Sequence, residues 1–443
     1  MVGGGLVGCV LAVYLAKRGH QISVFERHAD PRTALGSTRS AVNITLCERG
    51  LRALAAVGMR DRVSSLCVPV HGRRIHGLDD TVAYQPYGNR SEAIYSISRS
   101  DLNKALIELA EKEQGVQFHF GQKCVHVELA RATAHFEDTH VGTVSQIESE
   151  RLFGADGAYS TVRLHMQKTE YFNYSQQYWS QCYTSVRIPP RPGGEPILES
   201  GTLHIWPRGN CMLIAFPNRD CSVTASLLIP RRGENSRESL STAALMRSFF
   251  HALFRDAVRA VPDLPDQFFA EPVNSLLTVR CDPWSCEDKV LLIGDAAHAI
   301  LPSYGQGANA GFEDCSILDG CIERHGTDWG AAFRSFESER KASMDTIADL
   351  CIEHFTELCD LVGDPKFLRR REIERRLEEL HPDLYQPLYS MVSFGFMSYA
   401  DAIRVDRRQR ALVDHMMEMD EIDDKIDGPE VRKLLNESVR RAG

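Results

Sequence analysis

Residues 290–315 combine a short apolar run with glycines and small polar residues, a combination that suits contact with a ligand. The apolar run Val290–Ile293 predicts one buried strand, which Gly294–Asp295 ends. Pro302 can continue neither a strand ladder nor a helix interior, so the chain must turn there. The glycines from Gly305 onward let the backbone approach a ligand closely. A helix predicted to begin directly after them would offer that ligand free N–H groups and a positive dipole end.

A flavin is a ligand that this pattern suits. Its N1–C2=O edge becomes negatively charged on reduction, and a helix N-terminus stabilises negative charge. Asp295, at the end of the strand, suits the hydroxyls of a ribityl chain, and Gly305 and Gly307 allow close approach of the backbone. The alternative is a closely packed strand–loop–helix that binds nothing, and this stretch alone leaves that alternative open.

The N-terminus carries a second candidate binding motif. The spacing Gly3-x-Gly5-x-x-Gly8 matches the dinucleotide fingerprint, which needs a tight turn, a close approach to pyrophosphate and close helix–sheet packing. The largely apolar segment 21–25 predicts the next strand, and it ends in Glu26. An acid about twenty residues along the chain holds a ribose in such sites. The acid favours an adenosine without a 2′-phosphate, and therefore FAD or NAD rather than NADP.

A third segment supports this interpretation. In residues 152–163 a predicted strand ends in Gly-Ala-Asp-Gly, and a helix is predicted to begin at about Ser160. Asp156 is placed to accept hydrogen bonds from backbone N–H groups and to join the cofactor strand to the neighbouring loop. We interpret its role as mainly structural.

Composition narrows the possible functions. The 443 residues are 43% hydrophobic and 25% charged, as in ordinary soluble globular proteins. The net charge of −9 argues against a nucleic-acid partner. No apolar run reaches the ~18 residues of a membrane span, and the start of the chain predicts no signal peptide. The thirteen cysteines form no CxxC pair and no ligand spacing, which predicts a reducing cytoplasm and no metal site.

The pattern of elements predicts three regions in an α/β chain. Strand and helix patterns around the binding motifs indicate a discontinuous cofactor domain. The β-rich segments separated by Pro/Gly turns indicate an antiparallel sheet, and the charged last part of the chain indicates a helical region. The predicted boundaries are 1–66, 92–167 and 280–326 for the FAD-binding domain, 67–91 and 168–279 for the β-sheet substrate domain, and 327–443 for the C-terminal helical region.

Taken together, these segments resemble the group A flavoprotein aromatic hydroxylases, and within that group the kynurenine 3-monooxygenase family. The resemblance covers nearly the whole chain and implies a Rossmann-like FAD-binding domain of the GR2/PHBH type. The motifs that carry it are GGGLVG, VNITL, HGRRIH…PYG, SISRSDLN, GADGAYSTVR, YSQQY, LHIWPR, GDAAHAILP, GQGANAGFEDC and PLYSMVSF.

The resemblance implies which residues contact the cofactor. They come from the glycine turn (residues 3–8), the end of the second strand and three separate positions further along the chain. The others are Asp295 and residues of the flavin loop (residues 299–309). The implied FAD contacts are Gly3, Gly5, Val7, Gly8, Phe25, Glu26, Arg27, His28, Thr45, Arg99, Cys124, Asp295, Gly305, Gln306, Gly307, Ala308 and Asn309.

The resemblance also implies a site for an aromatic amino acid. Arg73, Tyr87 and Tyr389 would hold its carboxylate, because a guanidinium grips a carboxylate in a fork and phenols add directional donors. Three further pocket residues depart from the family pattern, and the pocket is either adjusted for kynurenine or reshaped for a related substrate. Ser303, after Pro302, replaces an aromatic residue, Leu228 a phenylalanine and His354 an asparagine.

The implied reaction consumes O2 and NADPH or NADH, the nicotinamide binding transiently, and hydroxylates L-kynurenine to 3-hydroxykynurenine through a flavin C4a-hydroperoxide. The implied enzyme is cytoplasmic, without a visible membrane anchor, and is a monomer or homodimer. One alternative is a sister monooxygenase acting on another aromatic amino acid or aminobenzoate. A more remote one is a non-enzymatic carrier on the same fold, which would be expected to lose the flavin loops.

Overall fold

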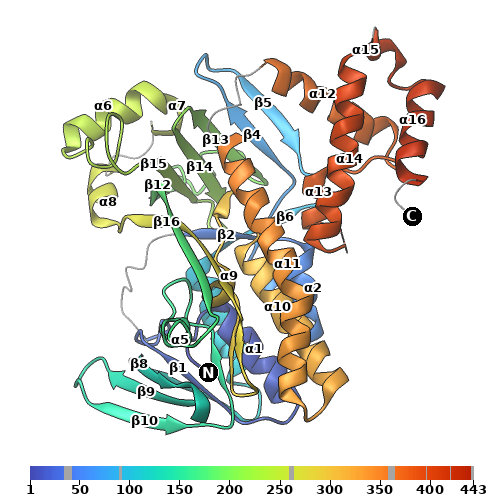
Figure 1. Ribbon diagram of the computed structural model, residues 1–443. Coiled ribbons are helices and arrows are strands. Elements are labelled where there is room, and N and C mark those ends of the chain that lie inside the picture. The colour runs from blue at the N-terminus through green and yellow to red at the C-terminus, as the bar shows by residue number, and fades with distance from the viewer. Residues whose placement is uncertain are drawn as a thin grey trace.

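The structure is a computed structural model, shown as a ribbon in Figure 1. It describes residues 1–33, 42–88, 92–258, 264–357, 365–395, 397–419 and 421–440. In the view of Figure 1, a large sheet occupies the upper left, the glycine-turn region lies below it, and the C-terminal helices lie at the upper right.

A mainly parallel sheet carries the N-terminal glycine turn. Val2 forms single parallel bridges to Phe25 and to Gly154, so it stands between two strand pairs. One pair is parallel, and the other extends into an antiparallel edge strand. In chain order the strands are β1 (Ile22–Glu26), β7 (Val116–Phe120), β11 (Leu152–Gly154), β17 (Ser285–Cys286) and β18 (Val290–Leu292).

The largest sheet has seven strands in the order β16-β12-β15-β14-β13-β4-β5. Every neighbouring pair is antiparallel except β4 and β13, which pair in parallel from Thr202 opposite Gly72 to Ile205 opposite Ile75. The strands are β4 (Gly72–His76), β5 (Val82–Pro86), β12 (Asn173–Ile188), β13 (Thr202–Arg208), β14 (Cys211–Pro217), β15 (Val223–Pro230) and β16 (Asn274–Asp282).

Two small antiparallel sheets complete the β-structure. One has the order β2-β6-β3, with β2 (Asn43–Leu46), β3 (Val68–Val70) and β6 (Ile94–Ser98). The other has the order β10-β9-β8 and lies at the lower edge of the molecule in Figure 1, with β8 (Gln122–Glu128), β9 (Thr133–Asp138) and β10 (Val144–Glu148).

The helices fall into two groups. Those before residue 326 accompany the sheets: α1 (Leu6–Lys17), α2 (Glu48–Ala56), α3 (Arg60–Ser64), α4 (Arg99–Ala110), α5 (Thr161–Met166), α6 (Ala243–Leu253), α7 (Arg255–Val258), α8 (Leu264–Ala270), α9 (Asp295–His298) and α10 (Gly307–His325). The C-terminal group comprises α11 (Trp329–Thr356), α12 (Pro365–Leu380), α13 (Leu388–Ser393), α14 (Tyr399–Met417), α15 (Ile422–Lys425) and α16 (Pro429–Arg440).

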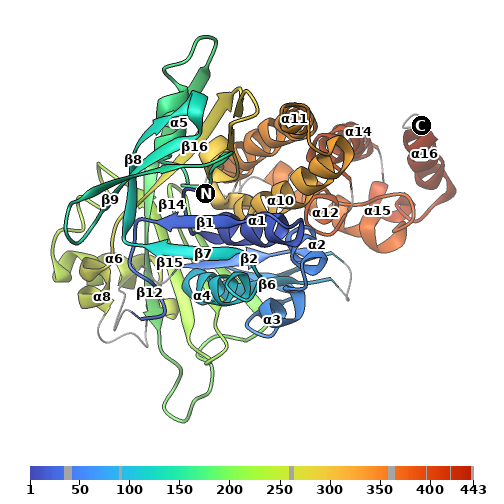
Figure 2. The ribbon, with the colours of Figure 1, turned by 90° about the horizontal axis from the view of Figure 1, so that it is seen from below.

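The main core lies around α1. This helix is apolar on all sides, and its residues from Gly8 to Ala16 are all buried. A helix without a polar face must be covered all round. α10 packs against α1, α2 and α11, and Figure 2 shows α1 and α10 side by side next to β1. The glycine turn and the start of α10 therefore both pack against the core around α1.

The α/β fold class predicted from the sequence is confirmed, with the large sheet and the C-terminal helices as separate layers. One feature differs from the expectation of an antiparallel sheet, namely the parallel pairing of β4 with β13. The helices of the described residues include none with the length and apolar character needed to cross a bilayer.

Candidate active site

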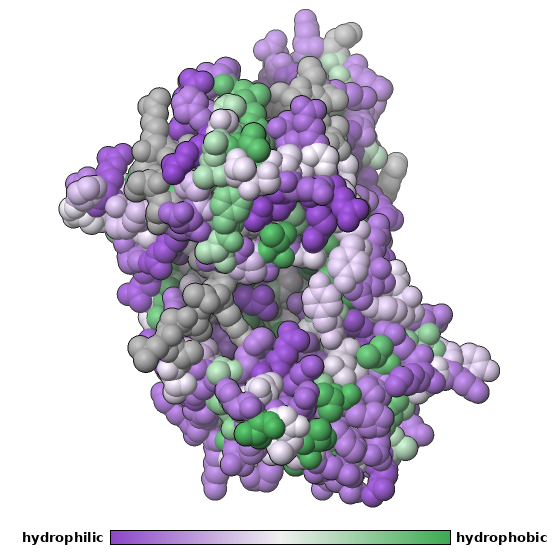
Figure 3. Space-filling model, turned by 90° about the vertical axis from the view of Figure 1, so that its left-hand side faces the viewer, coloured by the Kyte–Doolittle hydropathy of each residue, from purple (hydrophilic) through white to green (hydrophobic). Residues whose placement is uncertain are grey.

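A cavity of about 680 Å³ lies between the parallel sheet and the large sheet. This volume falls in the roughly 300–1,000 Å³ range of small-molecule and cofactor sites. Its walls come from the glycine turn, the ends of β1 and β18, the start of β8, the flavin loop and the strands β12, β14 and β15. Figure 3 shows the surface hollowed at mid-height, between the upper and lower parts of the molecule.

The three fingerprint glycines have three different surroundings. Gly3 has a φ of +103°, and a Cβ there would clash with the backbone of Ala155. A Cβ on Gly5 would meet nothing within 4 Å, because this residue faces the open cavity. A Cβ on Gly8 would clash with the carbonyl oxygen of Gly3, so Gly8 permits close packing of α1 and does not itself line the cavity. These are the three roles that the fingerprint requires.

The predicted acid stands at the end of β1. The carboxylate of Glu26 accepts hydrogen bonds from the N–H groups of Gly4 at 2.9 Å and His28 at 3.0 Å. Glu26 lines the cavity together with Phe25, Arg27 and His28, as predicted for the nucleotide end of the cofactor. The two backbone hydrogen bonds fix the carboxylate at the place where a ribose is held in dinucleotide sites.

The flavin loop turns sharply between α9 and α10. Gly305 has a φ of +66°, and its N–H donates to the carbonyl oxygen of Pro302 at 3.0 Å. Gly305, Gly307 and Ala308 line the cavity at the N-terminus of the nineteen-residue α10. The first turn of a helix this long presents unpaired N–H groups and a positive dipole end, both of which stabilise negative charge in the cavity.

Asn309 fixes the loop from behind. Its Oδ1 accepts a hydrogen bond from the Cys47 N–H at 2.9 Å, and its Nδ2 donates to the carbonyl oxygens of Thr45 and Gly305 at 2.9 and 2.8 Å. Asn309 is buried and does not line the cavity. Because its side chain joins the loop to β2 and the start of α2, a contact of Asn309 with the cofactor would use its backbone.

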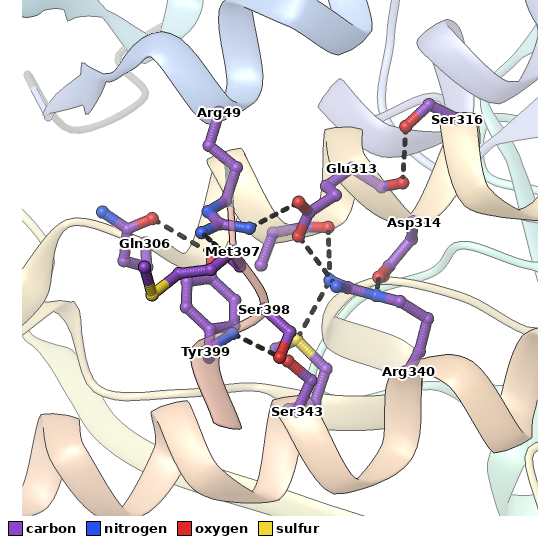
Figure 4. Close-up of polar contacts among 12 residues, drawn as sticks. Arg49, Gln306, Glu313, Asp314, Ser316, Arg340, Ser343, Met397, Ser398 and Tyr399 are labelled. Carbon is purple, nitrogen blue, oxygen red and sulfur yellow. Dashed lines mark hydrogen bonds and ion pairs between the residues drawn. The ribbon is translucent and has the colours of Figure 1, made fainter. Parts of the chain in front are cut away.

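Gln306 also lies behind the cavity wall. Its Oε1 accepts a hydrogen bond from the hydroxyl of Tyr399 at 3.1 Å, and it is buried. Figure 4 shows the Gln306 side chain directed toward Tyr399, which lies in α14. A contact of Gln306 with the cofactor would therefore also use the backbone.

A buried charged network lies next to Gln306 (Figure 4). Arg49 and Arg340 both bind the carboxylate of Glu313, and Arg340 Nε also donates to Asp314 at 2.8 Å. Asp314 lies 2.7 Å from Nε2 of His298. Burial alone would raise the pKa of Asp314, but its contacts with His298 and with the guanidinium of Arg340 hold it below its ordinary value. The network joins α2, α9, α10 and α11 behind the flavin loop.

The remaining predicted cofactor residues face the cavity. Val7, Thr45, Arg99, Cys124 and Asp295 all line it. Arg99 begins α4 and Asp295 begins α9, and both side chains are exposed. Burial raises the pKa of Cys124 to about 12, so its thiol is neutral at physiological pH.

Asp156 has the structural role predicted for it. Its Oδ2 accepts hydrogen bonds from the N–H groups of Thr161 at 2.7 Å and Val162 at 3.3 Å, at the start of α5. Its other oxygen, Oδ1, is buried and has no hydrogen-bond partner in the part of the chain that the structure describes. Since Asp156 lines the cavity, this acceptor suits a ligand that brings a hydroxyl donor.

These observations fit an FAD molecule. Gly5 opens the turn to a pyrophosphate, Glu26 suits an adenosine ribose, Asp156 and Asp295 offer acceptors to a polyol chain, and α10 offers a positive end to a flavin.

A smaller cavity of about 120 Å³ lies beside the larger one: Tyr304 and His354 line it, and their chain neighbours Ser303 and Phe355 line the larger cavity. It is lined by four of the predicted substrate residues, Arg73, Tyr87, Tyr389 and His354, and also by Tyr304. The rings of Tyr87 and Tyr389 stack with centroids 5.0 Å apart, and Tyr304 lies 5.5 Å from Tyr389 and 4.6 Å from His354. The recess is therefore aromatic on one side and cationic at Arg73.

Arg73 is oriented by one neighbour. Its Nε donates to Oε1 of Gln85 at 2.8 Å, across the β4–β5 pair. Among the described residues its two Nη groups have no hydrogen-bond partner. A guanidinium held in this way can bind a carboxylate through both Nη groups.

Pro302, Ser303 and Leu228 line the larger cavity rather than the recess. Ser303 Oγ donates to the carbonyl oxygen of Cys351 at 2.6 Å, and Nδ1 of His354 lies 3.1 Å from the carbonyl oxygen of Ser303. Burial, together with the positive charge of Arg73, lowers the pKa of His354 to about 3. His354 is therefore neutral, and its Nδ1–H donates to Ser303. Two of the three residues that depart from the family pattern are thus bonded to each other.

Most of the residues that line the two cavities were not predicted from the sequence, and three of them stand out. Tyr183 of β12 lines the larger cavity beside Leu228, its partner on β15, and burial raises its pKa. Gln85 and Tyr304 line the recess. The sequence had no signal for which face of β12 meets the cofactor domain.

Comparisons with known proteins agree with this geometry. The model of the family described as "FAD binding domain" matches residues 1–347. A solved 2-methyl-3-hydroxypyridine-5-carboxylic acid oxygenase shares the fold at a TM-score of 0.67 and 20% identity, covering 82% of this chain and 92% of that one. Pseudomonas aeruginosa PqsL, solved in complex with 2-aminobenzoylacetate, shares it at a TM-score of 0.64 and 19% identity, covering 81% and 95%. The fold and site define an FAD-dependent monooxygenase of the aromatic hydroxylase class.

Relatives with higher sequence identity indicate the family within this class. A kynurenine 3-monooxygenase of Flavobacterium johnsoniae is 41% identical over 441 residues, covering 100% of this chain and 98% of the relative. One of Christiangramia forsetii is 40% identical over 441 residues, with 100% and 98% coverage, and one of Dictyostelium discoideum is 35% identical over 455 residues, with 98% of each covered. The chain belongs to the kynurenine 3-monooxygenase family.

Proposed function

We propose that this enzyme hydroxylates L-kynurenine to 3-hydroxykynurenine, consuming O2 and NADPH or NADH. The observation that supports this substrate most directly is the recess beside the flavin cavity, which Arg73 lines together with four tyrosines. A ligand that fits both features carries a carboxylate and an aromatic ring. Relatives at 41% and 40% identity that are named for kynurenine support the same choice.

In this proposal Arg73, Tyr87 and Tyr389 bind the carboxylate end of the substrate. The guanidinium forms the charged pair, and the stacked phenols enclose it and exclude water. The aromatic end then lies toward Leu228, Pro302 and Ser303, which line the neighbouring flavin cavity. His354 stays neutral and holds the backbone of Ser303, so it shapes the wall between the two cavities without carrying charge into it.

When bound, FAD supplies hydride acceptance from the nicotinamide and the activation of O2. The residues of the chain supply position and electric field. The N-terminus of α10 stabilises negative charge beside Gly305, Gly307 and Ala308. Kynurenine needs no strong protein base, because its ring amine supplies the electrons for attack on an electrophilic oxygen.

Three further properties belong to the proposal. The nicotinamide substrate binds transiently, since the sequence has one dinucleotide fingerprint, which the FAD site uses. The enzyme acts in the cytoplasm as a monomer or homodimer. Nucleic acid is not a partner, consistent with a net charge of −9.

The test is product analysis with FAD-loaded protein. NADPH, ¹⁸O-labelled O2 and L-kynurenine are mixed, and we expect 3-hydroxykynurenine containing one labelled oxygen, formed in proportion to the NADPH consumed. Tryptophan and anthranilate serve as matched aromatic controls and should give little hydroxylated product. Consumption of NADPH with hydrogen peroxide as the sole product would make kynurenine an effector and would overturn the proposal. Faster hydroxylation of a control compound would instead identify a different substrate.

A further inference from the structure

Two histidines and a glutamate form a cluster on the sheet β10-β9-β8, apart from both cavities. His126 and Glu128 are alternate residues of β8, so they share a face of that strand, and His135 of β9 pairs directly opposite His126. One potential ligand atom from each residue can be chosen so that all three lie within 4.8 Å of one another. His126 is exposed and the other two are half-buried, so an ion can reach them from solvent. None of the three lines the flavin cavity or the recess.

A third histidine, His165 on α5, fixes the tautomer of His126. Nδ1 of His165 lies 3.0 Å from the carbonyl oxygen of Thr161, which can only accept, so this nitrogen carries the proton. Nε2 of His165 is therefore an acceptor, and it lies 3.0 Å from Nδ1 of His126. His126 must donate from Nδ1, which leaves its Nε2 unprotonated. Metal-binding histidines commonly donate their second ring N–H to a neighbouring group in this way.

Two of the three proposed ligands already contact each other across β8 and β9. Nε2 of His135 lies 2.9 Å from Oε1 of Glu128, so the proton between them would leave when both atoms bind a metal.

We propose that His126, Glu128 and His135 form a binding site for a divalent transition-metal ion of the Zn²⁺ type, with His165 as a positioning residue. Two imidazoles and one carboxylate are a ligand set that Zn²⁺ uses, with a fourth position left for water. Imidazole ligands disfavour Mg²⁺ and Ca²⁺, which prefer oxygen. Zinc–ligand distances of about 2.0–2.2 Å require the ligand atoms to converge, and partly exposed side chains can do this by small rotations.

The site would connect two strands next to the cofactor. Gln122, Lys123 and Cys124 of β8 line the flavin cavity, and a bulge separates Cys124 from His126. A metal bridging β8 and β9 directly after this bulge would fix the irregular part of the strand. We therefore expect the ion to stabilise this sheet without taking part in the reaction.

The test is metal binding to tag-free, FAD-loaded protein. After incubation with Zn²⁺ and desalting, elemental analysis should find one Zn²⁺ per chain, and Co²⁺ should give the visible d–d absorption of a low-coordinate site. Excess Mg²⁺ should not displace either ion. His126→Ala and Glu128→Gln should remove the bound metal and the Co²⁺ absorption, whereas His140→Ala, an exposed histidine between β9 and β10, should leave both unchanged.

The positioning role has its own readout. His165→Ala should weaken Zn²⁺ binding roughly 10–100-fold, because His126 loses the acceptor that fixes its tautomer, and His165→Gln, whose side-chain oxygen can accept that hydrogen bond, should restore most of the affinity. Flavin absorption and circular dichroism verify that each variant is folded. Less than stoichiometric Zn²⁺ in the parent protein, or equal Zn²⁺ in the parent and His126→Ala, would overturn the proposal, whatever the outcome of the kynurenine assay.

Discussion

At the scale of residues, two neighbouring arginines illustrate how the structure separates binding from surface charge. Arg73 and Arg74 are consecutive on β4, so their side chains lie on opposite faces of the sheet. Arg73 lines the recess, held by Gln85, while Arg74 forms an ion pair with Glu199. Without the family resemblance, the sequence offered no reason to choose one arginine over the other.

This difference defines a matched pair of variants. Arg73→Ala should weaken L-kynurenine binding by about 1.5–3 kcal/mol, the value of a hydrogen bond to a charged group, which corresponds to roughly 10–100-fold in Kd. FAD content should not change, because Arg73 does not line the flavin cavity. Arg74→Ala should leave both quantities close to those of the parent. Titration of flavin absorbance with kynurenine measures the affinity, and equal affinities in Arg73→Ala and the parent would refute the carboxylate site.

Other residues of the site could be predicted only in part. The glycines, Glu26 and Asp156 were predicted from their own chemistry, because a turn, a ribose contact and a helix start each require particular residue types. The sequence did not predict that the side chains of Gln306 and Asn309 are directed away from the cavity, because both form hydrogen bonds with segments that are distant in the chain. The histidine cluster was missed for a similar reason, since it requires the register of β8 against β9.

At the scale of elements, the flavin loop is the part that local chemistry predicts best. Pro302, Gly305 and Gly307 are close together in sequence, and they determine the turn and the start of α10 without help from distant residues. By contrast, the parallel pairing of β4 with β13 joins segments far apart along the chain, and no local pattern specifies it. Pairing of this kind depends on the placement of whole layers.

The loop makes a specific prediction about glycine. Gly305→Ala should reduce FAD affinity and lower the unfolding temperature, because φ is +66° and a Cβ there would clash with Oγ1 of Thr45. Gly326→Ala, at the other end of α10, is the control: φ is +59°, but a Cβ would meet nothing within 4 Å. Because ψ at Gly326 is −114°, outside the left-handed helical region, the control should lose stability through backbone strain, but it should keep its FAD. Equal FAD retention in both variants would mean that the turn does not hold the flavin.

At the scale of the whole molecule, buried neutral histidines link stability to pH. Burial lowers the pKa of His354 to about 3 and that of His204 to about 4. Below the unfolded value of about 6.5, the unfolded chain binds protons that the folded protein does not. The free energy of unfolding therefore falls as pH falls through this range, by at most about 1.4 kcal/mol per pH unit for each group.

His354→Asn isolates one of these groups. Urea unfolding is measured between about pH 7 and about pH 5. As pH falls, the free energy of unfolding should decrease less steeply in the variant than in the parent, by up to about 1.4 kcal/mol per pH unit. His140→Asn, which replaces an exposed histidine, should keep the parent slope. Identical slopes in His354→Asn and the parent would show that His354 takes up its proton in the folded enzyme as readily as in the unfolded chain.

The charged network behind the flavin loop has a consequence for biosynthesis. Arg49 donates to the carbonyl oxygens of Val392 at 3.1 Å and Met397 at 2.8 Å. Helix α2, near the start of the chain, therefore has hydrogen-bond acceptors that are synthesised near the end of the chain. Until the ribosome has released α13 and the beginning of α14, this guanidinium lacks two of its acceptors and Gln306 lacks Tyr399. A nascent chain can thus form the glycine turn early, but it gains a firmly held prosthetic group only as translation finishes.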